Sequence, residues 1–293
     1  MSRNNSDRFG TGENTAPIGG AEAPPTNVDT TATNPTGLQF SVPTEHVELP
    51  SQGKYYPEGH PLHNQETIEI KYMTAKEEDI LTSPTLLKKG LTIERLLRSV
   101  ILDRSVDPQT LLTGDRNAII VAARTTGYGP DYAAKINCPN CYNSTDWTVD
   151  LSTLGIKTGG INNREGYNVS QNEDGTFSVT LPKSKVVVAV KLLTGKDENE
   201  MATAQQKRKK RNLRENTLTE QLKNMIVSVN GSTKYTDIES FVDFVPAFDS
   251  KYLRNAYSQI MPNIDMNHDF ECSHCDYEGE VEVPLTAEFF WPK

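Results

Sequence analysis

Two Cys-x-x-Cys pairs that lie far apart in the chain most constrain how it can fold. They are CPNC at residues 138–141 and CSHC at residues 272–275, and they contain all the cysteines of the 293-residue chain. A turn of this spacing brings two sulfurs to one ion, so two such turns can supply the thiolates of a closed tetrahedral zinc site. We therefore expect one structural Zn²⁺ per chain, bound by Cys138, Cys141, Cys272 and Cys275.

The residues around both pairs favour strands. Residues 145–149 follow the first pair, and Phe270 and residues 280–283 flank the second. Strands on both sides of a knuckle are typical of a zinc ribbon. The interval between the pairs is far longer than the ~15 to 20 residues of a compact ribbon. We therefore predict a ribbon that is split by an inserted, largely helical segment, with the metal clamping its ends.

Other fates of the thiols remain open: two disulfides, a redox dithiol, four reduced thiols, or replacement of one cysteine ligand by His268 or His274. No apolar run approaches the ~20 residues needed to cross a bilayer, and residues 1–30 lack a secretory pattern. We therefore expect the chain to fold in a reducing cytoplasm, where thiols persist or hold metal.

Nothing in the sequence indicates catalysis. The chain has no Gly-x-Gly-x-x-Gly, no Walker-type Gly-Lys-Ser/Thr loop, no Gly-x-Ser-x-Gly and no His-Glu-x-x-His. A site closed by four thiolates also leaves no position for a water or a substrate on the metal. We predict that the chain is not an enzyme and has no catalytic residues.

The chain is expected to be α+β, with a mainly helical body, short antiparallel strands and the split ribbon. Residues 1–37 are polar and are expected to be disordered or ordered only by a partner. Residues 38–135 are expected to form an extended strap and a helical domain. Residues 136–155 with 268–293 would form the ribbon, and residues 156–267 an inserted hairpin and helical segment.

Within residues 38–135, a strand is predicted over 67–72. A capping box, Thr74-x-x-Glu77, predicts a helix that ends near Ser83 and Pro84. An apolar stripe over 93–101 predicts a second helix. Asp107-Pro108 indicates a short helical turn, and Gly114-Asp115 is expected to cap another helix that stops at Gly127.

The insert is expected to contain a hairpin of residues 177–181 and 186–193. A long helix capped by Asp197-x-x-Glu200 follows, and its second half carries an apolar stripe that continues to Val229. Thr236-x-x-Glu239 is expected to open a pair of helices.

Three further features have two interpretations each. The basic run KRKKR at 207–211, with Arg214 nearby, could bind phosphate or an acidic protein neighbour, but a solvated helix face is favoured. The acidic cluster at 77–79 suits a helix N-terminus better than a metal site. The aromatic tail at 289–291 could seal the core or anchor in a neighbouring subunit.

Several segments resemble the baseplate hub protein family of T-even-like phages. They are LPSQG at 49–53, YPEG at 56–59, KYMTAKEEDIL at 71–81, LL-x-GDRN at 111–117 with Arg124 and GYG at 127–129, the two cysteine pairs, and FFWP at 289–292. The polar segment at the start of the chain and the basic run near Lys207 depart from the family pattern.

The resemblance implies a structural or assembly component of a contractile tail baseplate in the virion, assembled in the host cytoplasm. Its partners would be other hub, wedge or tail-tube proteins, with homo-oligomerisation also open and no membrane. A net charge of −9 argues against nucleic acid as a partner. The alternatives are a zinc-ribbon nucleic-acid-binding protein using the basic run, a transient assembly chaperone, and, more remotely, a metalloenzyme.

Overall fold

The computed structural model describes residues 31–33, 39–161, 166–211, 216–283 and 287–290. By its internal contacts the chain divides into two units, Met1–Pro43 and Thr44–Lys293, which are considered separately. In the first unit, β1 (Thr31–Thr33) pairs in antiparallel register with β2 (Gln39–Ser41). The rest of the expected N-terminal extension, Arg214 of the basic segment and Trp291 of the aromatic tail lie outside the described residues.

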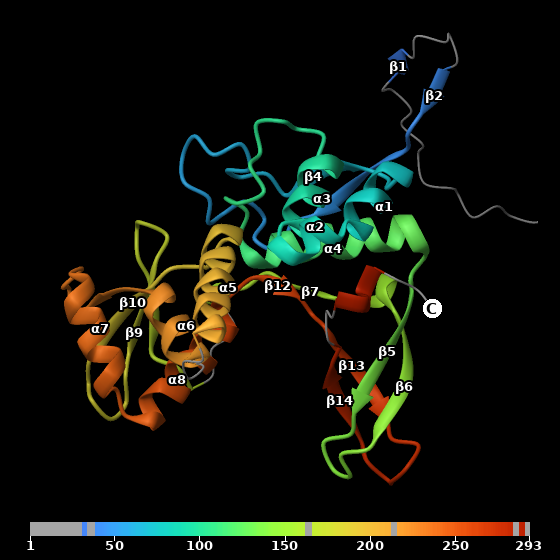
Figure 1. Cartoon of the computed structure of the whole chain (residues 1–293). Helices are drawn as coiled ribbons and strands as arrows, with labels where there is room; N and C mark the ends of the chain where they lie inside the picture. Colours follow the sequence, from blue (N-terminus) through green and yellow to red (C-terminus); the bar gives the residue numbers. More distant parts are fainter. Residues whose placement is uncertain (1–30, 34–38, 162–165, 212–215, 284–286, 291–293) are drawn as a thin grey trace, which may run out of the picture. The chain divides into compact units, whose positions relative to one another are not determined.

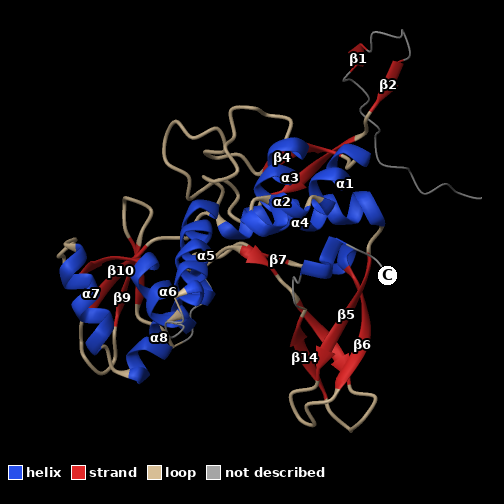
Figure 2. Ribbon diagram, viewed as in Figure 1, coloured by secondary structure: helices blue, strands red, loops and turns tan. Residues whose placement is uncertain are grey.

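The described part of the second unit combines eight α-helices with short antiparallel strands, which confirms the α+β class (Figure 1; Figure 2). The helices are α1 (Ala75–Thr82), α2 (Pro84–Lys89), α3 (Thr92–Val100), α4 (Thr113–Tyr128), α5 (Gly195–Lys210), α6 (Thr217–Met225), α7 (Tyr235–Phe244) and α8 (Ala247–Ile260). The strands are β3 (Thr44–Glu48), β4 (Thr67–Lys71), β5 (Asp131–Asn137), β6 (Ser144–Asp150), β7 (Ile156–Lys157), β8 (Val169–Gln171), β9 (Phe177–Thr180), β10 (Val187–Val190), β11 (Ile226–Val229), β12 (Asn263–Ile264), β13 (Asn267–Glu271) and β14 (Glu278–Glu282). Two 3₁₀ turns, η1 (Leu151–Thr153) and η2 (Ala287–Phe290), complete it.

The first strand and helices form where the sequence predicts them. β4 pairs with β3, and α1 begins directly after Thr74. The Glu77 carboxylate accepts hydrogen bonds from the backbone N–H and the hydroxyl of Thr74, at 2.9 and 2.6 Å, which completes the predicted capping box. The stripe on α3 is buried as expected, with Leu96 and Leu97 fully inaccessible.

Helix α2 and the extent of α4 differ from the prediction. α2 begins at Pro84, where a missing N–H costs no helical bond. Residues 107–112 form turns and no helix, and α4 starts at Thr113. Asp115 does not cap α4, because its carboxylate accepts hydrogen bonds from other residues. The helix also continues beyond Gly127 and ends before Gly129, whose φ is +85°.

A four-stranded antiparallel sheet, in the order β11-β10-β9-β8, contains the predicted hairpin. Phe177 and Val179 on β9 and Val188 and Val190 on β10 are fully buried. The prediction that the apolar stripe continues as a helix to Val229 is wrong. α6 ends at Met225, and residues 226–229, three of which are β-branched, form an edge strand that pairs with β10.

The helices of the insert form near their predicted places but have different caps. Thr194 caps α5 and forms a capping box with Asp197, so the predicted box of Asp197 and Glu200 is wrong. α5 and α6 are separate helices, not halves of one. α7 and α8 form the predicted pair, divided at Pro246. No helix in the described ranges is long and apolar enough to span a membrane.

Candidate metal centre

Each cysteine pair lies at the tip of an antiparallel hairpin. β5 and β6 are paired along their full length, and the backbone bonds Cys138 N–H to Asn143 O and Tyr142 N–H to Cys138 O, both 2.9 Å, close the first tip. β13 and β14 pair likewise, and Cys272 N–H donates to Tyr277 O at 3.0 Å. The two hairpins lie side by side (Figure 1), so the fold brings together turns that are far apart in sequence.

The four sulfurs form one cluster, with all Sγ atoms within 4.8 Å of one another. Two of the separations join different hairpins: Cys138 to Cys275 and Cys141 to Cys272, both 3.7 Å. A disulfide requires about 2.0 Å, and the four thiols are unbridged. Four sulfurs at about 2.3 Å from one zinc would lie about 3.8 Å apart in a regular tetrahedron. The cluster therefore fits a bound tetrahedral metal ion.

The knuckle backbone adds donors to the sulfurs. Asn140 N–H points at Cys138 Sγ and His274 N–H at Cys272 Sγ, each at 3.4 Å. Burial opposes ionisation of the Cys138 thiol, but the N–H donors of Cys141 and Asn140 and two neighbouring thiols lower its pKa to about 7. These donors favour the thiolate of Cys138, the form that binds metal. At Cys141 an N–H donor lowers the pKa, but burial and the neighbouring thiols outweigh it and raise the pKa to about 11.

The two histidines that could have replaced a cysteine ligand are not part of this cluster. The group of potential ligands formed by the described residues contains the four cysteines alone. His274 is exposed, and its Nδ1 lies 3.1 Å from the hydroxyl of Ser273. His268 sits within β13, opposite Val281.

Apolar side chains join the hairpins beneath the sulfurs. The rings of Trp147 on β6 and Phe270 on β13 meet edge to face, with centroids 5.2 Å apart, and Phe270 is buried. Ile136 and Val281 are buried as well. The hairpins therefore share a small core, and the sulfur cluster does not have to hold them together unaided.

The other end of the β5–β6 hairpin is fixed by a buried arginine. Arg124 on α4 is 1% exposed, and its guanidinium donates to the carbonyls of Phe289, Gly129 and Asp131 at 2.7 to 3.0 Å. Phe289 is buried against Tyr132 with ring centroids 4.9 Å apart. Phe290 is buried too, so these two aromatic residues seal the chain's own core.

Asp115 forms a second buried polar centre that the sequence reasoning did not assign. Its carboxylate accepts bonds from the N–H and hydroxyl of Ser51, at 2.9 and 2.5 Å, and from the hydroxyl of Tyr56 at 2.8 Å. Leu112 N–H donates in turn to the Tyr56 oxygen at 3.1 Å. The three segments singled out for their resemblance, 49–53, 56–59 and 111–117, therefore meet at one carboxylate.

The remaining charged features have structural roles or are exposed. Glu77 is fully buried and pairs with Lys71 at 2.7 Å, so it belongs to the α1 cap as the sequence indicated. The basic residues 207–211 end α5, where positive charge suits the helix C-terminus, and most are exposed.

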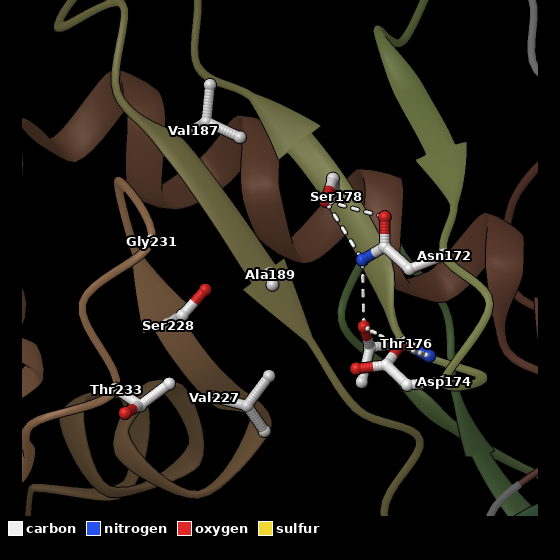
Figure 3. A pocket seen from close by; sticks show the side chains of 10 residues that line it. All are labelled: Asn172, Asp174, Thr176, Ser178, Val187, Ala189, Val227, Ser228, Gly231 and Thr233. Atoms are coloured by element: carbon white, nitrogen blue, oxygen red, sulfur yellow. Dashed lines mark hydrogen bonds between the residues drawn. The ribbon is translucent and has the colours of Figure 1, made fainter.

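A hollow of about 580 Å³ lies on the outer face of the four-stranded sheet (Figure 3). Its lining is small and polar, and Asp174 is its one ionisable side chain. That carboxylate is engaged by the N–H and hydroxyl of Thr176, at 2.9 and 2.6 Å. The hollow offers no acid, base or nucleophile set that would support catalysis.

The fold and the sulfur cluster define an α+β protein with a candidate metal centre at the tips of two hairpins. The chain belongs to the T4 bacteriophage base plate protein family, whose family model matches residues 42–291. This membership gives it a structural role in the tail baseplate of the virion, in contact with other baseplate proteins. No curated protein and no solved structure matched the chain.

Proposed function

We propose that the chain is a non-enzymatic structural subunit of the hub region of a contractile tail baseplate, clamped by one zinc ion. The family supports the baseplate role, and the segments that resemble the T-even-like hub proteins suggest the hub. The observation that best supports a metal clamp is the distance of 3.7 Å between Sγ atoms of the two hairpins, in the pairs Cys138–Cys275 and Cys141–Cys272.

In this proposal Cys138, Cys141, Cys272 and Cys275 hold the ion as thiolates. Zinc suits four sulfur ligands in tetrahedral geometry, and a site filled by thiolates holds no water for hydrolysis. The ion supplies a cross-link and no reaction. The cysteines that approach each other between the hairpins are 137 and 131 positions apart. A covalent link closing a loop of this order contributes about 5 kcal/mol in the chain-entropy treatment.

The clamp also gives a domain division, which we propose with it. Residues 136–155 and 268–293 form one module, and residues 156–267 are an insert whose two ends the metal fixes. Residues 38–135 form the strap and helical part. A rigid base beneath the insert would present the sheet and helices of 156–267 to neighbouring baseplate proteins in one orientation.

Quantitative mass spectrometry of purified tail particles tests this function. A fixed number of copies per particle, alongside the hub proteins, is the expected result. Abundance in infected cells with absence from finished tails would identify a transient assembly chaperone instead. If particles that lack the hub still contain the chain in a fixed ratio to wedge or tube proteins, the hub position is contradicted but the structural role is not.

A pair of knuckle variants connects the metal to assembly. Replacing Cys272 and Cys275 together by Ser should remove the ion and reduce incorporation into tails. Ser273→Ala, in the same knuckle but without a ligand, should leave both unchanged. Normal incorporation of a metal-free double variant would show that the clamp is dispensable for the structural role.

A further inference from the structure

The end of α5 carries five Lys and Arg residues in succession, at 207–211, which is more positive charge than a helix C-terminus requires. Lys207, Lys209, Lys210 and Arg211 are all exposed. Among the described residues, none of these four forms an ion pair. Four cations within five residues repel one another, so an anionic surface covering them would be favourable.

A surface of matching charge and size exists on the same chain, on the outer face of the β13–β14 hairpin. In that hairpin Asp269 stands directly opposite Glu280, and Glu271 opposite Glu278. Glu282 extends the row, and all five carboxylates are exposed. Like charges on directly opposed strand positions destabilise a hairpin.

This carboxylate face has little internal compensation. Lys135 on β5 lines the same hollow as Glu280 and Glu282. It makes no ion pair with either, and no other cation of the described ranges pairs with the five carboxylates. A cationic partner that covers these five carboxylates would therefore reduce the repulsion among them.

We propose that the basic end of α5 docks on the carboxylate face of the β13–β14 hairpin of a second copy of this chain. Within one chain, no ion pair joins the two surfaces among the described residues. Because the surfaces are different, the contact is head to tail, and its repetition gives a ring if the rotation closes and a filament if it does not. A second copy is favoured over nucleic acid because the whole chain carries a net charge of −9.

The contact is expected to be weak and salt-dependent in free solution. An exposed ion pair contributes about 0 to 1 kcal/mol, so the pairs act as a group, and salt at about 0.5 M screens them. Holding neighbouring copies in one assembly raises their effective concentration and makes such a contact sufficient.

Charge reversal tests the proposal, with sedimentation analysis at about 100 µM chain in low and high salt as the readout. The basic-reversal variant carries Lys207→Glu and Lys210→Glu, and the acid-reversal variant carries Glu278→Lys and Glu280→Lys. The wild type should associate at low salt and dissociate at high salt. Each variant alone should stay monomeric, because two reversals cancel the net charge of the four exposed cations or leave the five carboxylates with a net charge of −1.

An equimolar mixture of the two variants is the decisive sample. The acid-reversal chain keeps its basic end and the basic-reversal chain keeps its carboxylate face, so the mixture should form mixed pairs, whereas a chain carrying all four reversals should stay monomeric. A mixture that associates no more than either variant alone would overturn the proposal. Association unaffected by the reversals, or a wild type that is monomeric in low salt, would also overturn it.

Two control variants test whether charge reversal elsewhere on the surface has the same effect. Lys88→Glu with Lys89→Glu makes the same change at the exposed end of α2, and Glu66→Lys with Glu173→Lys makes it away from the hairpin. Both should associate like the wild type. A wild type that does not self-associate but is retained on DNA in a salt-sensitive way would point to nucleic acid as the partner instead. In that case the basic reversal should abolish the retention.

Discussion

The Asp115 carboxylate accepts a 2.5 Å hydrogen bond from the hydroxyl of Ser51, and both residues are buried. The two residues belong to segments 64 positions apart in the chain. Burial raises the pKa of Asp115, while the donors from Ser51 and Tyr56 lower it, and the net shift is upward. The buried carboxylate is therefore stabilised by these hydrogen bonds, and the buried donors of Ser51 and Tyr56 have it as their acceptor.

Replacing Asp115 by Ala should destabilise the fold by about 2 to 4 kcal/mol, because three donors lose their buried acceptor. Urea unfolding followed by circular dichroism measures the loss. Asp103→Ala removes an exposed turn carboxylate and should cost less than about 1 kcal/mol. Equal losses in the two variants would show that the buried network adds no stability.

Glu77 should make stability depend on pH in the acid range. Burial acts to raise its pKa, but bonds from Lys71, Ser99 and Thr74 outweigh burial and lower the pKa to about 2. A lowered carboxyl pKa gives stability that is present above the unfolded-state pKa near 4.5 and is lost as the pH falls toward 2.

Glu77→Gln should therefore be destabilised by up to about 3 kcal/mol at pH 7, and the difference from wild type should shrink between pH 5 and pH 2. Urea midpoints of both proteins over this range provide the test. A difference that stays constant with pH would mean that the capping geometry matters and the charge does not.

Gly114 is required by the close approach of α4 to the segment before β12. A Cβ at this position would lie 1.9 Å from the carbonyl oxygen of Pro262, which is backbone and cannot swing away. Gly114→Ala should lower the thermal midpoint by several degrees, whereas Gly155→Ala, whose nearest neighbour would be 3.8 Å away, should not. Equal midpoints for the two variants would contradict the contact.

Arg124 should control how firmly the C-terminal turn is held. Replacing it by Met keeps much of the volume but leaves three carbonyls, including that of Phe289, without their donor. We expect a loss of about 2 to 4 kcal/mol and faster proteolytic cleavage near η2, located by mass spectrometry. Cleavage at the wild-type rate would show that packing of Phe289 alone holds the turn.

Local signals in the sequence predicted much of this fold, and tertiary contacts account for most of what they missed. The capping box of Thr74 and the stripe on α3 depend on neighbours in sequence, so they were readable. Residues 226–229 were assigned to a helix because their spacing extends the stripe of α6. Pairing with β10 decides their structure, and periodicity does not encode that partner.

The candidate site shows the same division. Both cysteine turns and their strands follow from spacing and composition, and the structure brings all four sulfurs within 4.8 Å of one another. That they bind a metal stays a prediction. Arg124 and Asp115 were present in segments noted for resemblance, but their roles depend on carbonyls and hydroxyls brought in from far along the chain. A charged residue at a helix position facing apolar neighbours is the one signal that could have drawn attention to Asp115.

Metal content of the purified chain tests the central claim most directly. The protein would be prepared under reducing conditions without added metal, and zinc would be measured by elemental analysis against chain concentration, with the Cys272→Ser, Cys275→Ser double variant and Ser273→Ala beside it. The account predicts one zinc per wild-type and Ser273→Ala chain and none in the double variant. A wild-type chain that folds without zinc, or that keeps its zinc when both cysteines are replaced, would contradict it.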